Sequence, residues 1–162
     1  MFSSGQSLAP YVASPMNVVK KMLEIAKVKP DDIVYDLGSG DGRIVIMAAH
    51  DFGARGIGVD INPNMVKEAR GKVEEAKVGD RVKIIQGHIL EADLKPATVV
   101  TMYLTTGANE KVRPKLEAEL KPGARIVTHD FSIPKWESVE ELRFRDDYRV
   151  HTIYLYVWSP KK

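Results

Sequence analysis

The residues best suited to chemistry lie at positions 36–42, which read Asp-Leu-Gly-Ser-Gly-Asp-Gly. They follow the apolar run 33–35, and a short strand that breaks into a glycine turn is how α/β folds receive nucleotide-like ligands. Glycines at alternate positions allow a ligand to approach the main chain closely. A second apolar run ends at Asp60, whose carboxylate can accept both hydroxyls of a ribose. The pattern predicts a site for a ribose-bearing ligand.

The charges around this turn indicate which ligand it takes. A dinucleotide site requires G-x-G-x-x-G and an open helix N-terminus for the pyrophosphate, but Arg43 occupies the third glycine position. Asp36 and Asp41 place two carboxylates at the turn, which repel a diphosphate and attract a cation. S-adenosylmethionine carries a sulfonium, an ammonium and a ribose but no phosphate, so it fits better. A turn that caps a helix and binds nothing is the alternative interpretation.

Composition limits the class of protein. A chain of 162 residues with 44% hydrophobic residues has the size of one domain, here 1–162, with a proper core. The net charge of +2 is too small to indicate nucleic-acid binding, and the absence of cysteine excludes disulfides and thiolate metal sites. Neither a leader-like start nor a run of 18 apolar residues occurs. We therefore expect a cytoplasmic monomer that binds neither membrane nor, stably, nucleic acid.

Apolar spacing predicts the elements that position the turn. Ser14 and Pro15 resemble an N-cap and first residue of a helix, and another helix begins at Asn62-Pro63 and ends near residue 78. Further helices are expected at 44–49 and 109–120, and strands at 33–37, 55–60, 82–85, 97–103, 124–129, 142–145 and 150–158. Five β-α units and a terminal hairpin predict an α/β fold, a Rossmann-like doubly wound seven-stranded sheet, mostly parallel, with a C-terminal antiparallel hairpin.

In such sheets the ligand lies beyond the carboxyl ends of the strands. Asp36, Asp60, the 87–89 loop, Tyr103 and His129 should therefore converge on one rim. A lone histidine near a strand end is more often structural than catalytic, and neither His88 nor His129 has a metal-binding partner at useful sequence spacing. We therefore expect no metal.

The turn resembles the first motif of the class I, seven-strand methyltransferases, an acidic residue followed by G-x-G-x-G. Asp36, Gly38, Gly40 and Gly42 match it position for position. Segments 11–15, 36–43, 99–104, 116–123 and 128–136 also resemble the small archaeal protein lysine methyltransferases, which are similar to mitochondrial enzymes that methylate the c-subunit of ATP synthase. The resemblance implies methyl transfer from S-adenosylmethionine to the ε-amine of protein lysines.

The resemblance also implies site residues and partners. Residues 1–14 form an arm over the active site, and Tyr103 and Tyr11 are the candidate catalytic residues. Substrates are proteins with exposed lysines, with small basic chromatin proteins as a candidate class. The small size of the chain, without an added recognition domain or a basic stripe, favours a broad range of substrates. The implied cofactor-binding residues are Asp36, Gly38, Ser39, Gly40, Asp41, Gly42, Asp60, Ile61, His88, Ile89 and Tyr103.

Methyl transfer to an amine sets its own requirements. The reaction is an in-line displacement by a neutral amine, so a lysine with an ordinary pKa near 10.4 must first lose a proton. A dry aromatic pocket beside a sulfonium disfavours the ammonium form, and ring faces stabilise a methylated cation. Two alternatives stay open at this point: a small-molecule or RNA methyltransferase on the same fold, and a nucleotide-binding protein without methyl transfer.

Overall fold

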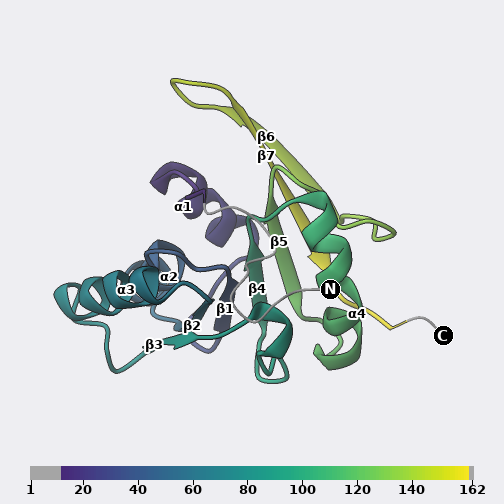
Figure 1. Ribbon diagram of the computed structural model, residues 1–162. Coiled ribbons are helices and arrows are strands. Elements are labelled where there is room, and N and C mark those ends of the chain that lie inside the picture. Colours follow the sequence, from purple (N-terminus) through teal and green to yellow (C-terminus); the bar gives the residue numbers. More distant parts are fainter. Residues whose placement is uncertain (1–11, 161–162) are drawn as a thin grey trace.

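The computed structural model describes residues 12–160 of the chain. Figure 1 shows one sheet with helices on both faces. The helices are α1 Met16–Ile25, α2 Arg43–Phe52, α3 Pro63–Glu75, the 3-10 helix η1 Ile89–Glu91 and α4 Thr106–Glu119. The strands are β1 Ile33–Leu37, β2 Arg55–Asp60, β3 Val82–Gln86, β4 Val99–Met102, β5 Arg125–His129, β6 Glu140–Arg145 and β7 Val150–Val157.

The sheet has seven strands in the order β3-β2-β1-β4-β5-β7-β6. β1 to β5 pair in parallel, whereas β7 pairs antiparallel with both β5 and β6. The chain order reverses beside β1, where β2 lies on one side and β4 on the other. Ligands of open α/β sheets bind beyond the carboxyl ends of the strands at such a reversal. The expected fold class and the terminal hairpin are confirmed.

The central strands are mostly apolar because both faces of the sheet are covered. Side chains alternate along β1, so that Val34 packs in one core with α1 and α2. Tyr35 packs in the other core with Val112 and Leu116 of α4. A third cluster joins α2 and α3 to β3. The two-sided burial holds the strand ends, and the residues that follow them, in fixed positions.

Two of the expected five β-α units lack their helix. β3 is followed by η1 and β5 by an irregular segment, 130–139, before β6. Both connections are short and contain a proline, Pro96 or Pro134, which interrupts helical hydrogen bonding. In the connection after β3, Ile89 and Leu94 are buried in the core that also contains Val112 and Leu116 of α4.

Helix boundaries also differ from expectation. Pro15 rather than Ser14 is the N-cap of α1, and it makes no side-chain capping bond. The Ser14 hydroxyl is instead bonded to the His129 ring on β5. α4 begins three residues before the predicted Asn109 because the Thr105 hydroxyl caps it by accepting from the Ala108 N–H. α3 ends at Glu75, although its Asn62 cap is as expected.

Along residues 12–160, none of the helices has the length and apolar character needed to span a bilayer.

Candidate active site

The turn after β1, residues 38–42 and here called the glycine turn, is fixed to the end of β2 by backbone bonds. The N–H groups of Gly38 and Ser39 donate to the Val59 carbonyl at 2.8 and 2.9 Å. The Gly40 N–H donates to the Asp60 carboxylate at 2.8 Å. Gly38, Gly40 and Gly42 all have positive φ, which residues with a Cβ rarely adopt. The glycines are thus required by the path of the turn itself.

Asp60 connects three segments at the rim. One carboxylate oxygen accepts from Gly40, the other accepts from the Asn62 N–H at 2.9 Å, and the Asp60 carbonyl accepts from the Gly87 N–H at 2.9 Å. Its side chain is therefore held rigidly, and each oxygen retains a lone pair for another donor. The 87–89 loop lies beside it, as expected. His88 there caps η1, since its Nδ1 accepts from the Leu90 N–H.

The two carboxylates at opposite ends of β1 differ in their bonding partners and in the direction of their pKa shifts. Asp32, just before the strand, pairs with the Arg125 guanidinium and accepts from the Thr98 hydroxyl. These bonds outweigh burial and lower its pKa. Asp36, near the carboxyl end, accepts only from the Thr101 hydroxyl, at 2.7 Å, and no Lys or Arg among residues 12–160 forms an ion pair with it. Burial, and then Asp60 and Asp41, raise the pKa of Asp36 to about 7.

Asp41, the second acidic residue of the turn, already has cations of its own. Its carboxylate accepts from Arg43 Nη2 at 2.8 Å and from Lys72 Nζ at 3.1 Å. Despite burial, the bonds from Arg43 and Lys72 lower its pKa to about 2. Arg43 also donates to the Ser14 carbonyl at 3.0 Å. Asp41 thus helps to hold residue 14 against the turn, while Asp36 is the carboxylate without a cation.

A small pocket lies between the glycine turn, the chain before α1 and the end of β4. Asp36 and Tyr103 of the predicted site line it, together with residues 12–14 at the end of the predicted arm. Tyr11, the other predicted catalytic residue, lies outside the described residues. The pocket is lined by Val12, Ala13, Ser14, Asp36, Gly38, Ser39, Asp41, Arg43, Ile44 and Tyr103.

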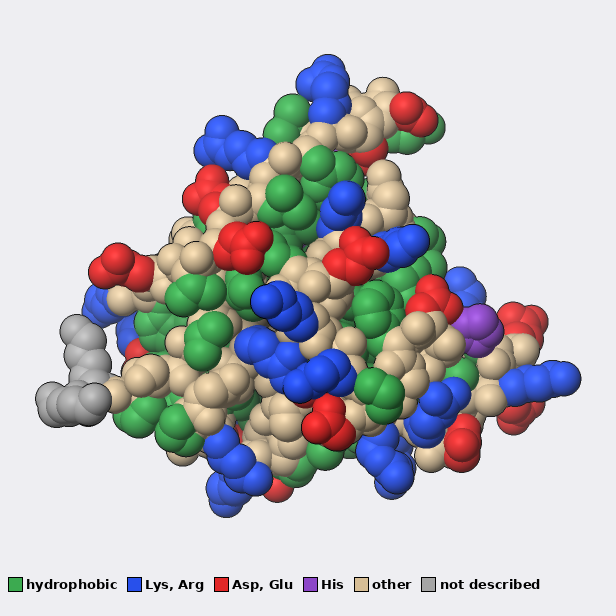
Figure 2. Space-filling model, turned by 180° about the vertical axis from the view of Figure 1, so that it is seen from behind, with side chains coloured by type: hydrophobic (Ala, Val, Ile, Leu, Met, Phe, Trp, Pro, Cys, Tyr) green, Lys and Arg blue, Asp and Glu red, His purple; other side chains and the backbone are tan. Residues whose placement is uncertain are grey.

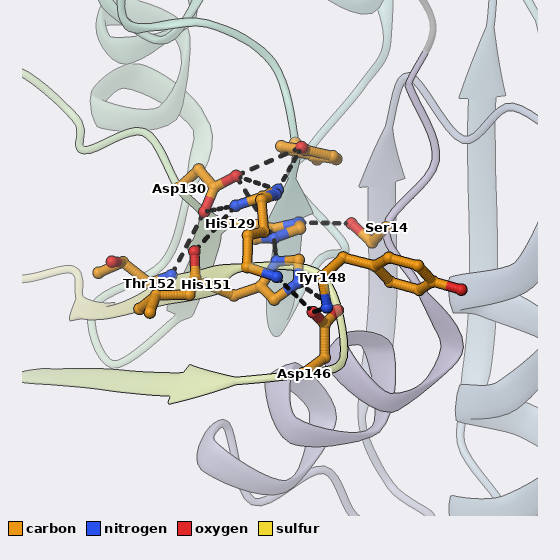
Figure 3. Close-up of polar contacts among 10 residues, drawn as sticks. Ser14, His129, Asp130, Asp146, Tyr148, His151 and Thr152 are labelled. Atoms are coloured by element: carbon orange, nitrogen blue, oxygen red, sulfur yellow. Dashed lines mark hydrogen bonds and ion pairs between the residues drawn. The ribbon is translucent and has the colours of Figure 1, made fainter.

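Figure 3 shows a polar cluster that includes His129, Asp130 and His151. Tyr103 contacts this cluster. The Tyr103 ring packs on that of His129 with centroids 3.9 Å apart. The Tyr103 hydroxyl donates to Asp130 at 3.3 Å and accepts from Arg149 at 3.2 Å. His129 is bonded in turn to His151 of β7 at 2.8 Å. The rim therefore gathers the predicted residues, including His129, at the ends of β1, β2, β4 and β5.

Spacing along the chain predicted no metal-binding partner for His129. The pairing of β5 with β7, which that spacing does not reveal, brings His151 beside it. The ligand atoms of His129, Asp130 and His151 lie within 4.8 Å of one another. We assign no metal to them, since Arg149 Nη2 lies 2.7 Å from Asp130 and the two imidazoles are bonded to each other. The partners His151, Asp146 and Arg149 were missed altogether.

The chemistry of these groups fits a cationic, ribose-bearing cofactor. Asp36 offers a buried carboxylate without a cation, and Asp60 offers oriented oxygens for hydroxyls. S-adenosylmethionine presents both kinds of group and has no phosphate to be repelled by Asp36, Asp41 and Asp60. Ile61 follows Asp60, and Ile89 is buried next to His88, so both flank the same rim.

The chain matches known proteins in sequence and structure. A model of the ANTKMT methyltransferase domain matches residues 36–140. A protein-lysine N-methyltransferase of Saccharolobus islandicus is 52% identical over 94% of this chain and 96% of that protein. The adenine nucleotide translocase lysine N-methyltransferase of Mus musculus is 35% identical over 80% of this chain, which spans 56% of the mouse protein.

One solved structure is similar over nearly all of both chains. It is described as an RNA methyltransferase from Salinibacter ruber in complex with S-adenosyl-L-homocysteine, with a TM-score of 0.86, 44% identity, and coverage of 93% of this chain and 98% of that one. Together with the glycine turn and its two carboxylates, these matches show that the chain belongs to the ANTKMT methyltransferase domain family and has the class I, S-adenosylmethionine-dependent methyltransferase fold.

Proposed function

We propose that this protein transfers methyl groups from S-adenosylmethionine to the ε-amine of lysines in proteins. The observation that carries the proposal is the pairing of a carboxylate without a cation, Asp36, with the oriented Asp60 beside a pocket walled by Tyr103. The naming of the Saccharolobus relative as a protein-lysine N-methyltransferase supports this choice of acceptor. S-adenosylmethionine supplies the electrophilic methyl group.

The residues of the chain then have separate tasks. Asp60 accepts from the ribose hydroxyls, and Asp36 binds the ammonium group of the cofactor's amino acid part. Gly38, Ser39, Gly40 and Gly42 let the main chain approach the cofactor. Asp41 positions Arg43 and thereby the arm. The remaining predicted contacts, at the adenine side, are Ile61, His88 and Ile89.

The acceptor amine enters beside Tyr103. The ring of Tyr103 is half-buried, and the bonds of its hydroxyl to Asp130 and Arg149 fix its orientation. An aromatic wall excludes water and stabilises a methylated cation through its face. The arm, residues 1–14 including Tyr11, covers the same channel in this proposal, and Val12 to Ser14 already line it.

Specificity for the protein substrate is proposed to be broad. The face in Figure 2 shows basic, acidic and hydrophobic side chains interspersed, in keeping with 24 Lys and Arg against 22 Asp and Glu. Such a surface favours many exposed lysines over one sequence, with small basic chromatin proteins as a candidate class. A single-domain monomer in the cytoplasm remains our prediction from the sequence.

RNA is the second candidate acceptor because the Salinibacter structure is described as an RNA methyltransferase. We expect label from methyl-labelled S-adenosylmethionine to enter the protein fraction of a cell extract and to be found on lysines of several proteins by mass spectrometry. Label confined to RNA would contradict the proposal, and label on one site in one protein would contradict the broad range. Asp60→Ala serves as the matched inactive protein.

Asp60 should be required for cofactor affinity. Asp60→Ala is expected to weaken S-adenosylmethionine binding about a hundredfold, in the range lost when a charged hydrogen-bonding partner is removed. Calorimetric titration measures this, and circular dichroism checks that the sheet persists. Asp80→Asn, at an exposed carboxylate before β3, is the control. An affinity equal to that of the unaltered protein would remove Asp60 from the site.

Asp36 should favour cofactor binding and lower the stability of the ligand-free protein. Its raised pKa means that its contribution to stability is complete below pH 3.8 and is lost as pH rises through about 7. Asp36→Asn is therefore expected to stabilise the ligand-free protein by about 1–3 kcal/mol at pH 8 and by less at pH 5, while it weakens cofactor binding. Urea unfolding at both pH values tests this, with exposed Asp31→Asn as control; a loss of stability at pH 8 would refute it.

Tyr103 should act mainly on turnover. Tyr103→Ala removes the aromatic wall and is expected to reduce kcat at least about tenfold while the cofactor Kd changes less than about threefold. Tyr103→Phe keeps the ring and should retain most of the activity. The reverse pattern, a large rise in Kd with kcat preserved, would place Tyr103 against the cofactor instead of the amine.

A further inference from the structure

A line of three hydrogen bonds leads from the pocket to the turn between β6 and β7 (Figure 3). Ser14 Oγ lies 2.9 Å from His129 Nδ1, and His129 Nε2 lies 2.8 Å from His151 Nδ1. His151 Nε2 lies 2.6 Å from an oxygen of Asp146. Ser14 lines the pocket beside Tyr103, while Asp146 begins the hairpin turn. The line thus joins the acceptor side of the pocket to the outer surface.

The donor and acceptor of each bond can be derived by starting from Asp146, at the outer end of the line. An ionised carboxylate only accepts, so His151 Nε2 carries a hydrogen and donates to Asp146. In a neutral ring the other nitrogen then accepts, so His151 Nδ1 accepts from His129 Nε2–H. By the same step, His129 Nδ1 accepts from the Ser14 hydroxyl. Every donor therefore points outward, from the pocket toward Asp146.

Both imidazoles are enclosed. His129 is 0% and His151 2% exposed, between Tyr103 on one side and Phe144, whose ring centroid lies 5.6 Å from that of His151, on the other. Apolar side chains would fill the space between β5 and β7 without the cost of burying polar rings. A continuous polar path through this core is thus a costly feature that packing alone does not require.

At pH 7 the inner ring of the path is neutral and the carboxylate at its outer end is ionised. Burial lowers the pKa of His129 to about 4, so this ring is neutral at pH 7. Bonds from the N–H groups of Arg149 and Tyr148 lower the pKa of Asp146 to about 2, so the carboxylate is ionised. The other charged or titratable groups that face the two rings are Asp130, Arg149 and Tyr103.

We propose that Ser14, His129, His151 and Asp146 form a relay that removes the proton from the acceptor lysine. This rests on the proposed function. One N–H bond of the ammonium breaks and its proton passes to Ser14 Oγ, as the Ser14 proton moves to His129 Nδ1. The proton on His129 Nε2 then moves to His151 Nδ1. The positive charge rests on His151 until its Nε2–H bond breaks and that proton passes to the Asp146 carboxylate and from there to water. The lysine keeps its electron pair for the methyl group.

The relay matters only while the acceptor is protonated. His151→Phe keeps a ring of similar size but interrupts the path, and is expected to reduce kcat at least about tenfold at pH 7, within the usual range for proton-transfer catalysis. Near pH 10 much of a lysine with an ordinary pKa is already neutral, so the loss should fall below about twofold. An equal loss at both pH values, or none at pH 7, would overturn the relay. Ile153→Val, buried on the same strand, is the control and should behave alike at both pH values.

A milder variant and a spectroscopic measurement cover the case that His151→Phe does not fold. Asp146→Asn keeps an oxygen for the turn but faces His151 with an amide N–H₂, which reverses all three bonds. We expect the same pH-dependent loss of kcat, together with a change of His129 from the Nε2–H to the Nδ1–H tautomer in nitrogen-15 spectra. An unaltered protein whose His129 already carries hydrogen on Nδ1 would overturn the relay. An unaltered protein that methylates no lysine would instead refute the proposed function, whatever the spectra show.

Discussion

The site depends on one constraint, the hydrogen bond from the Gly40 N–H to the Asp60 carboxylate. It joins the turn after β1 to the end of β2, so Asp36 and Asp60, the two carboxylates that we propose bind the cofactor, are held in fixed relative positions. The bond is possible because parallel pairing brings both strand ends to the same rim. Gly58 contributes on β2, since a Cβ there would lie 2.7 Å from Ser39 Oγ and displace the turn.

The two ends of β1 differ in how far the charge of their carboxylates is compensated. Asp32 has an arginine, a hydroxyl and a backbone donor, so its charge is compensated. Asp36 has a single hydroxyl and a raised pKa, an arrangement that costs the free protein stability and that a bound cation would repair. The buried pair His129 and His151 follows the same logic, because polar groups are retained in a core that apolar side chains could fill.

Local signals predicted much of this structure. Strand bounds such as 33–37 and 55–60 and the Asn62 cap followed from apolar runs and cap chemistry. Asp36, Asp60 and Tyr103 could be placed on one rim because parallel strands end together. Apolar spacing indicated no helix after β3 or β5, yet both were counted as β-α units, since strand spacing does not distinguish a short irregular connection from a helix. The contact of His129 with His151 arises from β5–β7 pairing 22 residues apart, and no sequence period encodes that register. For the same reason Ser14 was interpreted as a cap rather than a partner of His129.

The most direct test of this account is a crystal structure of the protein with S-adenosylhomocysteine. The account predicts ribose hydroxyls within hydrogen-bonding distance of both Asp60 oxygens, the ligand's ammonium at Asp36, and the sulfur facing the pocket between Ser14 and Tyr103. A ligand bound elsewhere, or one whose ribose does not touch Asp60, would contradict it.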